Sequence, residues 1–235
     1  KELSFNNLMD LNSALCVIRE FEQPAAVIIK HNNPTGVAEA KTLSQAYSQV
    51  WKSDPVSAFG GIIGCNRKID IQTARLIVKS GFMECIVAPG YDRQAFKALS
   101  SKKNLRLIQI DVKDFAVPGY DLRPVQGGLL LQEKDTKALD PKEVKIVTKK
   151  KPTAKQLESL LFGWKVIKHI RSNAVILVKD KRTVGIGCGQ TSRIESTMLA
   201  IKKAGRQARN SFLVSDAFIP KIDNVTIAAK EIGRA

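Results

Sequence analysis

The sequence predicts an α/β protein, because short β-branched apolar runs alternate along the chain with segments of helical periodicity. The run 25–29 is continuous and apolar, which is typical of a strand buried on both faces of a parallel sheet. Polar segments that contain Gly or Pro follow several of these runs. Because ligands of open α/β sheets gather at the carboxyl ends of strands, we expect the functional residues in these segments.

The first half of the chain follows this alternation in a regular order. Helical periodicity predicts helices at 8–21, 43–52, 71–79 and 93–100. Apolar runs predict strands at 25–29, 57–64, 83–88 and 105–110, and the glycines of 57–64 indicate that another group approaches that backbone closely. The Asn-Pro-Thr-Gly sequence 33–36 is expected to stop the first strand, and Pro89-Gly90 predicts a turn. This rhythm favours right-handed crossovers.

Turn-rich segments at 117–120 and 123–124 suit a linker, after which the alternation starts again. Thr153 is a good N-cap for a helix that continues to 170, and Ser192 and Glu195 have capping-box spacing at the start of another helix. Strands are predicted at 127–132, 174–178, 183–186 and 212–214, the second and third forming a hairpin. We therefore expect two domains, 1–125 and 126–235, which arose by internal duplication or are two similar subdomains.

Length and cysteine usage narrow the class of protein. The 235 residues suffice for one large domain or two small ones. They contain no apolar run long enough to cross a bilayer and do not begin with a secretory pattern, so a cytoplasmic location is the default. The four cysteines are widely spaced without a C-x-x-C pair, which predicts buried free thiols rather than zinc ligands or disulfides. The chain does not start with Met, so we expect a piece of something longer.

The net charge of +16 indicates an anionic partner, a basic surface that aids solubility, or a fragment whose acidic remainder is missing. Tight lysine clusters occur only at 102–103 and 149–151, and the sequence has no RNP, zinc-finger or helix-turn-helix signature. This distribution argues against nucleic acid. A small substrate that carries phosphate or carboxylate groups would be attracted by the same field.

Two polar motifs of the first half are candidates for ligand contact. Lys30-His31 places a cation and a group that titrates near neutrality at the end of an apolar run; the alternative is a strand end entering water. In the segment 54–61, glycines allow backbone amides to approach a ligand and Phe59 could stack on a flat ring. The alternative for this segment is a turn with a core Phe.

Three features of the second half are also candidates for ligand contact. The segment 185–193 joins a glycine-rich strand end to a helix start that carries Arg193, which favours a phosphate or carboxylate site but does not match a dinucleotide fingerprint. Asn173 presents an amide to a ligand or caps the preceding helix, and the segment 215–224 places polar groups and an aromatic after a strand. We interpret His169, which has no glycine or proline nearby, as structural.

Taken together, six segments resemble the transformylase part of the AICAR transformylase/IMP cyclohydrolase family of purine biosynthesis. In chain order they are 2–7, 29–34, 53–61, 86–91, 185–193 and 215–218. The resemblance covers essentially the whole chain, and six motifs in the right order are far more specific than any one of them.

The resemblance implies formyl transfer from the co-substrate 10-formyltetrahydrofolate to the 5-amino group of 5-aminoimidazole-4-carboxamide ribonucleotide, a step of IMP biosynthesis. It also implies a pair of cytidine-deaminase-like three-layer α/β/α subdomains that lack zinc, and the absence of H-x-E and P-C-x-x-C patterns in the sequence agrees with that loss. Members of the family form homodimers whose sites are shared across the interface, so a homodimer is expected.

The resemblance further assigns roles to individual residues. Lys30 and His31 match the catalytic pair, and Asn173 matches the Asn that assists them. The positions that hold the ribonucleotide are Asn7, Phe59, Gly60, Glu84 and Arg193, and those on the folate side are Ile194, Phe218, Pro220, Asp223 and Asn224. No metal ligand is implied.

Departures from the family pattern leave other functions open. The family's Arg-Tyr-Gly-Glu-Asn-Pro stretch is expected before Lys1, and its anion loop and histidine-containing tail are expected after Ala235; the cyclohydrolase domain is absent from the chain. Ile219, Lys221 and Ile222 replace two aromatics and an arginine. The alternatives are a non-catalytic ribonucleotide-binding remnant of the same fold and a basic nucleic-acid-binding protein.

Overall fold

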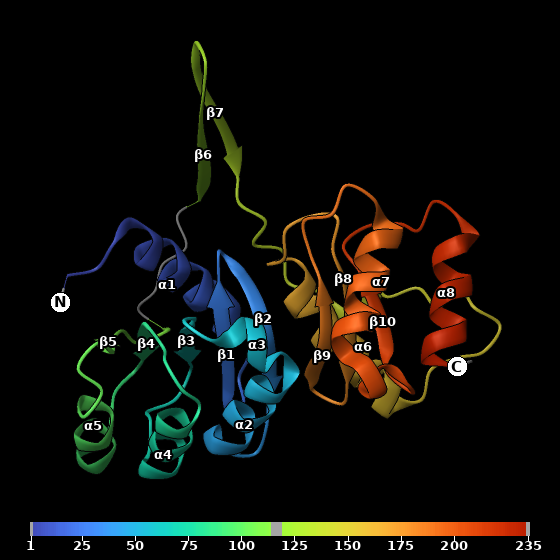
Figure 1. Cartoon of the computed structure of the whole chain (residues 1–235). Helices are drawn as coiled ribbons and strands as arrows, with labels where there is room; N and C mark the ends of the chain where they lie inside the picture. Colours follow the sequence, from blue (N-terminus) through green and yellow to red (C-terminus); the bar gives the residue numbers. More distant parts are fainter. Residues whose placement is uncertain (1, 114–118, 234–235) are drawn as a thin grey trace.

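A computed structural model describes residues 2–113 and 119–233 and shows an eight-stranded mixed sheet between two layers of helices (Figure 1). The strand order is β10-β8-β9-β2-β1-β3-β4-β5, and β6 and β7 form a separate two-stranded ribbon. The α/β class and the α/β/α layering predicted from the sequence are confirmed. The linker residues 117–118 lie outside the described residues.

Most element bounds follow the sequence pattern, but the prediction of a strand over 57–64 was wrong in its first half, because Asp54 caps the short helix α3 (Pro55–Ala58) and the strand begins only at Ile62. The helices are α1 Phe5–Ile18, α2 Leu43–Ser53, α3 Pro55–Ala58, α4 Ile71–Lys79, α5 Arg93–Ser100, α6 Ala154–Ile167, α7 Arg193–Ala204 and α8 Ile222–Ile232, with 3-10 turns at Pro141–Glu143 and Gly205–Ala208. The strands are β1 Ala25–Lys30, β2 Asn33–Glu39, β3 Ile62–Cys65, β4 Cys85–Ala88, β5 Arg106–Gln109, β6 Tyr120–Val125, β7 Gly128–Glu133, β8 Val175–Lys179, β9 Arg182–Gly187 and β10 Phe212–Ser215.

The strand β1 is buried on both faces, but it is antiparallel to both of its neighbours, so the prediction of a parallel arrangement at this strand was wrong. The prediction that the segment 33–36 stops this strand was also wrong, because these residues begin the next strand, β2. His31 and Asn32 have φ values of 52° and 60°, which form a two-residue hairpin turn that returns the chain as β2. Pro34 is tolerated in β2 because the register shifts at Ile28 and Ile29, opposite it.

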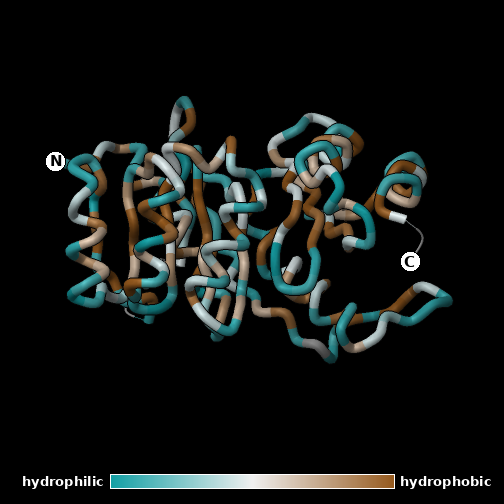
Figure 2. The backbone as a smooth tube through the Cα atoms, turned by 60° about the horizontal axis from the view of Figure 1, so that its bottom comes forward, coloured by the Kyte–Doolittle hydropathy of each residue, from teal (hydrophilic) through white to brown (hydrophobic). Residues whose placement is uncertain are grey.

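Helices cover both faces of the sheet and alternate residues of each strand face each layer. Helices α1 and α6 pack on one face, where Val27 and Ile176 join their apolar side chains. Helices α2, α4 and α5 cover the other face of β1 and β3 to β5, and α7 covers β8 and β9 with α8 packed outside it. Figure 2 shows the strands as hydrophobic traces in the middle of the molecule, between helices of alternating hydropathy. Burial of these apolar residues is the main stabilising term of the fold.

The two halves of the chain share one continuous sheet, because β2 pairs with β9 through Ala38 and Arg182. Thr183 strengthens this junction: its Oγ1 accepts from the Val37 amide at 3.0 Å, and Ser53 Oγ donates to its carbonyl at 2.8 Å. The predicted boundary after residue 125 falls in the turn between β6 and β7. The division into two cytidine-deaminase-like subdomains stays a prediction.

The segment predicted as a linker at 120 and 123–124 forms β6 instead. Pro124 is compatible with this strand because a two-stranded ribbon leaves one side of each strand without a partner. Helix α8 and strand β2 were not predicted from the sequence.

All four cysteines are free thiols, as predicted; Cys65 and Cys85 are buried, whereas Cys16 and Cys188 are half-buried. Burial raises the pKa of the Cys65 thiol to about 12 and that of the Cys85 thiol to about 11. In the described part of the chain, no helix has the length and apolar character needed to span a membrane.

Candidate active site

Strand pairing places the predicted site residues along a single edge of the sheet, which we call the site edge. The register aligns the end of β1 with the start of β2 and β3, and then with the start of β4. On the other side, the ends of β9 and β10 align with the start of β8. The sequence analysis placed the site residues only at the carboxyl ends of strands. Because the sheet is mixed, residues before the starts of β3, β4 and β8 lie on the same edge as residues after the ends of β1, β9 and β10.

A first group of residues surrounds the end of β1. Lys30 Nζ donates to the Phe59 carbonyl at 2.7 Å, and the Gly60 amide donates to the Phe82 carbonyl at 2.9 Å. The Phe59 and Phe82 rings lie 5.8 Å apart between centroids. Phe59 is 56% exposed, which excludes the alternative of a core Phe. The pair therefore offers an aromatic surface beside a lysine ammonium group.

His31 lies in the turn after Lys30 with its side chain exposed. Asp10 of α1 holds this turn, because its Oδ1 accepts from the Asn32 amide at 2.6 Å. Among the described residues, the imidazole of His31 forms no hydrogen bond. It is therefore accessible to a substrate while its backbone is held in place, as a general base requires.

Asn7 and Glu84 meet at the same edge. Asn7 Nδ2 donates to Glu84 Oε2 at 2.6 Å, and its Oδ1 accepts from the Ser4 amide at 3.2 Å. Asn7 is buried and forms the capping box of α1 with Ser4. This contact fixes the start of α1 to the start of β4 and orients the Glu84 carboxylate.

A second group forms around Arg193, at the N-terminus of α7. Arg193 Nη2 donates to Asn173 Oδ1 at 2.8 Å and Nη1 donates to Ser215 Oγ at 2.8 Å, while Nη1 also pairs with Asp216. Asn173 Nδ2 donates to the Gln190 carbonyl at 3.0 Å. Asn173 thus joins β8 to the loop that precedes α7.

The Arg193 charge is partly neutralised by Asp216. Burial alone would raise the pKa of Asp216, but hydrogen bonds from Ser172 and Arg193 hold it below its ordinary value. The carboxylate is therefore ionised at neutral pH, and an anion bound at the start of α7 meets a guanidinium that already has one acidic partner. Sequence reasoning did not single out Asp216 as this partner, because the pairing depends on β10 lying beside β8.

The glycines of the segment 185–193 have two separate roles. A Cβ on Gly187 would lie 2.7 Å from the Ser196 carbonyl carbon, and one on Gly185 would lie 2.9 Å from the Ala204 Cβ. Both glycines therefore allow close packing of α7 on β9. Gly189 has open space around it and a φ of +67°, so it serves the turn into α7.

The residues predicted for the folate side lie on α7 and on the segment from β10 to α8. Asn224 is buried, and its Oδ1 accepts from Thr197 Oγ1 at 2.8 Å. Thr197 Oγ1 in turn lies 3.0 Å from the Arg193 carbonyl. Asn224 and its neighbour Asp223 thus tie the start of α8 to the first turn of α7. Phe218 and Pro220 are exposed and Ile194 is half-buried.

A hydrogen bond between a backbone amide and a side chain links the two groups of the site edge. The Arg171 amide donates to Asn33 Oδ1 at 3.1 Å, which links the segment before Asn173 to the turn that carries His31. Within the described ranges, no cluster of three His, Cys, Asp or Glu side chains is arranged to hold a metal ion. The arrangement suits proton transfer beside an aromatic surface and anion binding near Arg193.

The chain matches the AICARFT/IMPCHase bienzyme family over residues 1–203. The chain belongs to this family. It is 51% identical over 230 residues to the bifunctional purine biosynthesis protein PurH of Thermoanaerobacter sp. (strain X514), covering 98% of this chain and 45% of that protein. It is 46% identical to PurH of Caldicellulosiruptor saccharolyticus (strain ATCC 43494 / DSM 8903 / Tp8T 6331), with 98% and 44% covered. The chain thus spans a little under half the length of these relatives.

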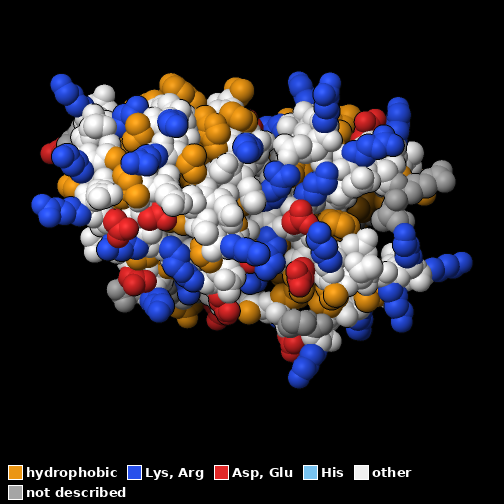
Figure 3. Space-filling view, turned by 90° about the horizontal axis from the view of Figure 1, so that it is seen from below, with side chains coloured by type: hydrophobic (Ala, Val, Ile, Leu, Met, Phe, Trp, Pro, Cys, Tyr) orange, Lys and Arg blue, Asp and Glu red, His pale blue; other side chains and the backbone are white. Residues whose placement is uncertain are grey.

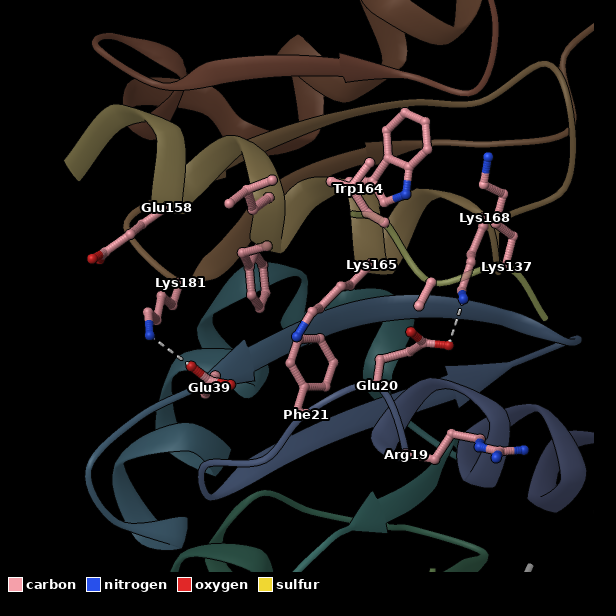
Figure 4. Close-up of a pocket in the computed structure, with 14 residues that line it drawn as sticks. Arg19, Glu20, Phe21, Glu39, Lys137, Glu158, Trp164, Lys165, Lys168 and Lys181 are labelled. Atoms are coloured by element: carbon pink, nitrogen blue, oxygen red, sulfur yellow. Dashed lines mark hydrogen bonds and ion pairs between the residues drawn. The ribbon is translucent and has the colours of Figure 1, made fainter. Parts of the chain in front are cut away.

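One cavity of this family member, of about 490 Å³, lies between α6 and the segment that joins α1 to β1. Figure 4 shows Trp164 and Lys165 of α6 above Glu20 and Phe21. Lys168 Nζ lies 2.8 Å from Glu20 Oε1 and Lys181 Nζ lies 2.9 Å from Glu39 Oε1, so two of the lysines that line this cavity have acidic partners within it. None of its lining residues is a predicted site residue. His169 also contacts Glu20, with Nε2 3.1 Å from Oε1.

Proposed function

We propose that this chain carries out the transformylase reaction, in which the formyl group of 10-formyltetrahydrofolate moves to the 5-amino group of 5-aminoimidazole-4-carboxamide ribonucleotide during IMP biosynthesis. Membership of the family supports this function. The structural observation that carries it is the position of Lys30, His31, Asn173 and Arg193 on the site edge, although they come from three separate segments of the chain: the end of β1, the start of β8 and the start of α7.

The chemistry assigns a distinct task to each catalytic residue. The substrate amine is conjugated with its ring and carboxamide, so it is a poor nucleophile until its proton is removed. His31 takes this proton as the amine nitrogen attacks the formyl carbon, and Lys30 holds positive charge beside it. Asn173 orients the carboxamide or donates to the oxyanion of the tetrahedral intermediate. The bond from the formyl carbon to N10 then breaks, and the proton passes to N10 of the departing tetrahydrofolate.

The binding roles follow the two groups of the site edge. Phe59 would contact the purine precursor with its aromatic face, and Gly60, whose amide already donates to the Phe82 carbonyl, would allow the backbone to approach the same ligand because it has no side chain. Glu84, held by Asn7, would accept from a polar group of the same ribonucleotide, and Arg193 would bind its anionic part. Folate would lie along Ile194, Phe218, Pro220, Asp223 and Asn224, where the exposed Phe218 is available for stacking.

The proposal includes a cytoplasmic homodimer in which each chain supplies part of two sites. Lys30 and Arg193 each have partners within their own group, and the hydrogen bond from the Arg171 amide to Asn33 Oδ1 joins the two groups within a chain. A site assembled from the first group of one chain and the second group of its partner is consistent with this separation. Two cytidine-deaminase-like subdomains without zinc remain part of the same proposal.

Steady-state formyl transfer with His31→Ala tests the assignment. Loss of a general base is expected to lower kcat by at least ~100-fold. The chain has two histidines, so His169→Gln is a matched control that keeps a hydrogen bond to Glu20 and is expected to retain activity. Equal rates for the His31 variant and the unmodified chain would remove His31 from the mechanism. Tight ribonucleotide binding without transfer would instead identify a non-catalytic binding module.

The charge distribution weighs against the nucleic-acid alternative. In Figure 3 lysines and arginines are spread over the whole visible face, with acidic and apolar side chains between them. A protein that follows a nucleic-acid backbone gathers its positive charge along one groove or stripe. Oligonucleotide binding that weakens steeply with salt would contradict this conclusion.

A further inference from the structure

The segment 54–61, which joins α2 to β3, carries Phe59 and Gly60 but has little apolar packing of its own. Val56 and Phe59 are 86% and 56% exposed, and Ala58 is the one buried residue of α3. Apolar burial therefore contributes little to the position of this segment. Polar contacts must instead hold the aromatic surface that Phe59 forms at the site edge.

Contacts within the first half hold the end of the segment next to β3. The Phe59 carbonyl accepts from Lys30 Nζ at 2.7 Å, and the Gly60 amide donates to a backbone carbonyl at 2.9 Å. A Cβ on Gly61 would lie 2.9 Å from the Ile29 carbonyl oxygen, so the chain packs directly on β1 at this point. This end of the segment is fixed by its immediate surroundings.

Asp54 holds the other end, at the junction between α2 and α3. Its Oδ1 accepts from the Ser57 amide at 3.0 Å, and its carbonyl accepts from the Ala58 amide at 3.0 Å. Asp54 is thus the N-cap of α3. A helix of one turn is not stable by itself, so the direction in which α3 leaves α2 depends on this side chain.

The second carboxylate oxygen of Asp54 meets a lysine from the other half of the chain. Lys203, in the last turn of α7, places Nζ 3.1 Å from Asp54 Oδ2. This oxygen is buried and, among the described residues, has no other partner. The side chains of Asp54 and Lys203 are only 12% and 29% exposed. Burial would raise the pKa of Asp54, but hydrogen bonds from Ser57 and Lys203 hold it below its ordinary value, so the pair is charged at neutral pH.

We propose that Lys203 is a positioning residue for ribonucleotide binding, because its ion pair with Asp54 holds α3 and thereby the surface of Phe59. The inference rests on the function proposed above and adds a residue that contacts no substrate. Without the ammonium group, the buried carboxylate would have no charged partner, which is strongly unfavourable. Asp54 would turn toward water, and the cap of α3 would be lost with it.

The same pair ties the two groups of the site edge together through α7. Arg193 begins this helix and Lys203 lies in its last turn, whereas Asp54 precedes the binding segment of the first group. A displacement of α7 is thereby passed to α3 as well as to the contacts of Arg193. Ribonucleotide binding at Phe59 therefore depends on a helix of the other half.

A lysine near the end of a helix has a simpler explanation, because the helix dipole favours cations there. Lys202 shares the last turn of α7, but it is exposed and takes part in no ion pair of the described residues. Lys202→Met therefore removes the same charge from the same turn and leaves Asp54 paired. It is the matched control for Lys203→Met.

Calorimetric titration of the whole chain with 5-aminoimidazole-4-carboxamide ribonucleotide measures the effect without requiring catalysis. Lys203→Met is expected to raise the dissociation constant at least ~10-fold, because a displaced surface loses part of its contact with the ligand. Lys203→Arg keeps the charge and should stay within ~3-fold of the unmodified chain, and Lys202→Met should stay within ~2-fold.

Steady-state kinetics and a second variant separate positioning from a general loss of stability. The KM for the ribonucleotide should rise in Lys203→Met while kcat changes less than ~3-fold, which is the pattern of a lost binding contact. Asp54→Asn keeps an oxygen for the Ser57 amide but turns an amide group toward Lys203, so it should weaken binding to a similar extent. Because the two substitutions remove one interaction, the double variant should bind within ~3-fold of either single variant.

Four results would overturn the proposal. They are an unchanged dissociation constant in Lys203→Met, equal effects of the Lys203 and Lys202 variants, additive effects in the double variant, and a Lys203 variant that unfolds at a lower urea concentration yet binds as tightly as the unmodified chain. Ribonucleotide binding with the expected pattern but without formyl transfer would refute the proposed reaction and leave the role of Lys203 supported. An unmodified chain that does not bind the ribonucleotide would refute both.

Discussion

Close packing of α7 on β9 predicts a large loss of stability for Gly187→Ala. The new Cβ would lie 2.7 Å from the Ser196 carbonyl carbon and 3.0 Å from its Cα, both backbone atoms of α7. The Ser196 carbonyl oxygen would lie closer still, and ordinary contacts need at least ~3.4 Å, so α7 would have to move by more than ~1 Å. That movement would disturb the packing of Ala200 and the bonds of Arg193.

Because the new methyl group is forced against backbone atoms, Gly187→Ala should lower the free energy of unfolding by about 3 kcal/mol. For a denaturant dependence of about 3 kcal/mol per M, the urea midpoint should fall by roughly 1 M. Gly128→Ala is the control, because no heavy atom lies within 4 Å of its Cβ and its φ is not positive. A Gly187 variant that unfolds at the same urea concentration as this control would refute the packing argument.

Two further substitutions test buried polar contacts, one at the end of β1 opposite the site edge and one at Arg193. Asn66→Ala should lower the free energy of unfolding, measured in urea, by about 3 kcal/mol. The Oδ1 atom of this buried side chain accepts from the Ala25 amide, and its Nδ2 donates to two backbone carbonyls, each at 2.8 Å. As a control, substitution of an exposed asparagine, Asn12→Ala, should change the free energy of unfolding by less than ~0.5 kcal/mol. Asp216→Asn should cost about 1–3 kcal/mol at pH 7, because Arg193 loses its charged partner. Because folding lowers the pKa of Asp216, its carboxylate contributes fully to the free energy of unfolding above pH ~5, and this contribution is lost as the pH falls through the pKa of the folded state. The difference in stability between the variant and the unmodified chain should therefore shrink below pH ~4. A difference that stays constant with pH would exclude this linkage.

Helices of the first half could be predicted to within a residue where the apolar spacing was clear. The helices α4 and α5 begin and end where the sequence predicted, and α2 is one residue longer. An aspartate precedes each of α4 and α5, and Asp70 caps α4 by accepting from the Thr73 amide. Local sequence determines such elements because the contacts that define them lie within one or two turns.

Strand direction could not be predicted in the same way. The run 25–29 is buried on both faces in the structure, as expected, but burial does not record whether a neighbouring strand runs parallel or antiparallel. The turn at His31 and Asn32 lacks the usual Asn-Gly signal, so the return strand β2 was missed. The partner of Arg193 was missed for a related reason, since Asp216 reaches it through the pairing of β10 with β8.

Complementation between two inactive variants tests the central claim most directly. Co-expression of His31→Ala with Arg193→Ala gives mixed dimers for about half of the molecules, and each mixed dimer has one intact site out of two if the chains share their sites. Formyl transfer is then expected to recover to about a quarter of the unmodified rate. Activity no higher than that of either variant alone would contradict a site built from Lys30 and His31 of one chain and Asn173 and Arg193 of the other.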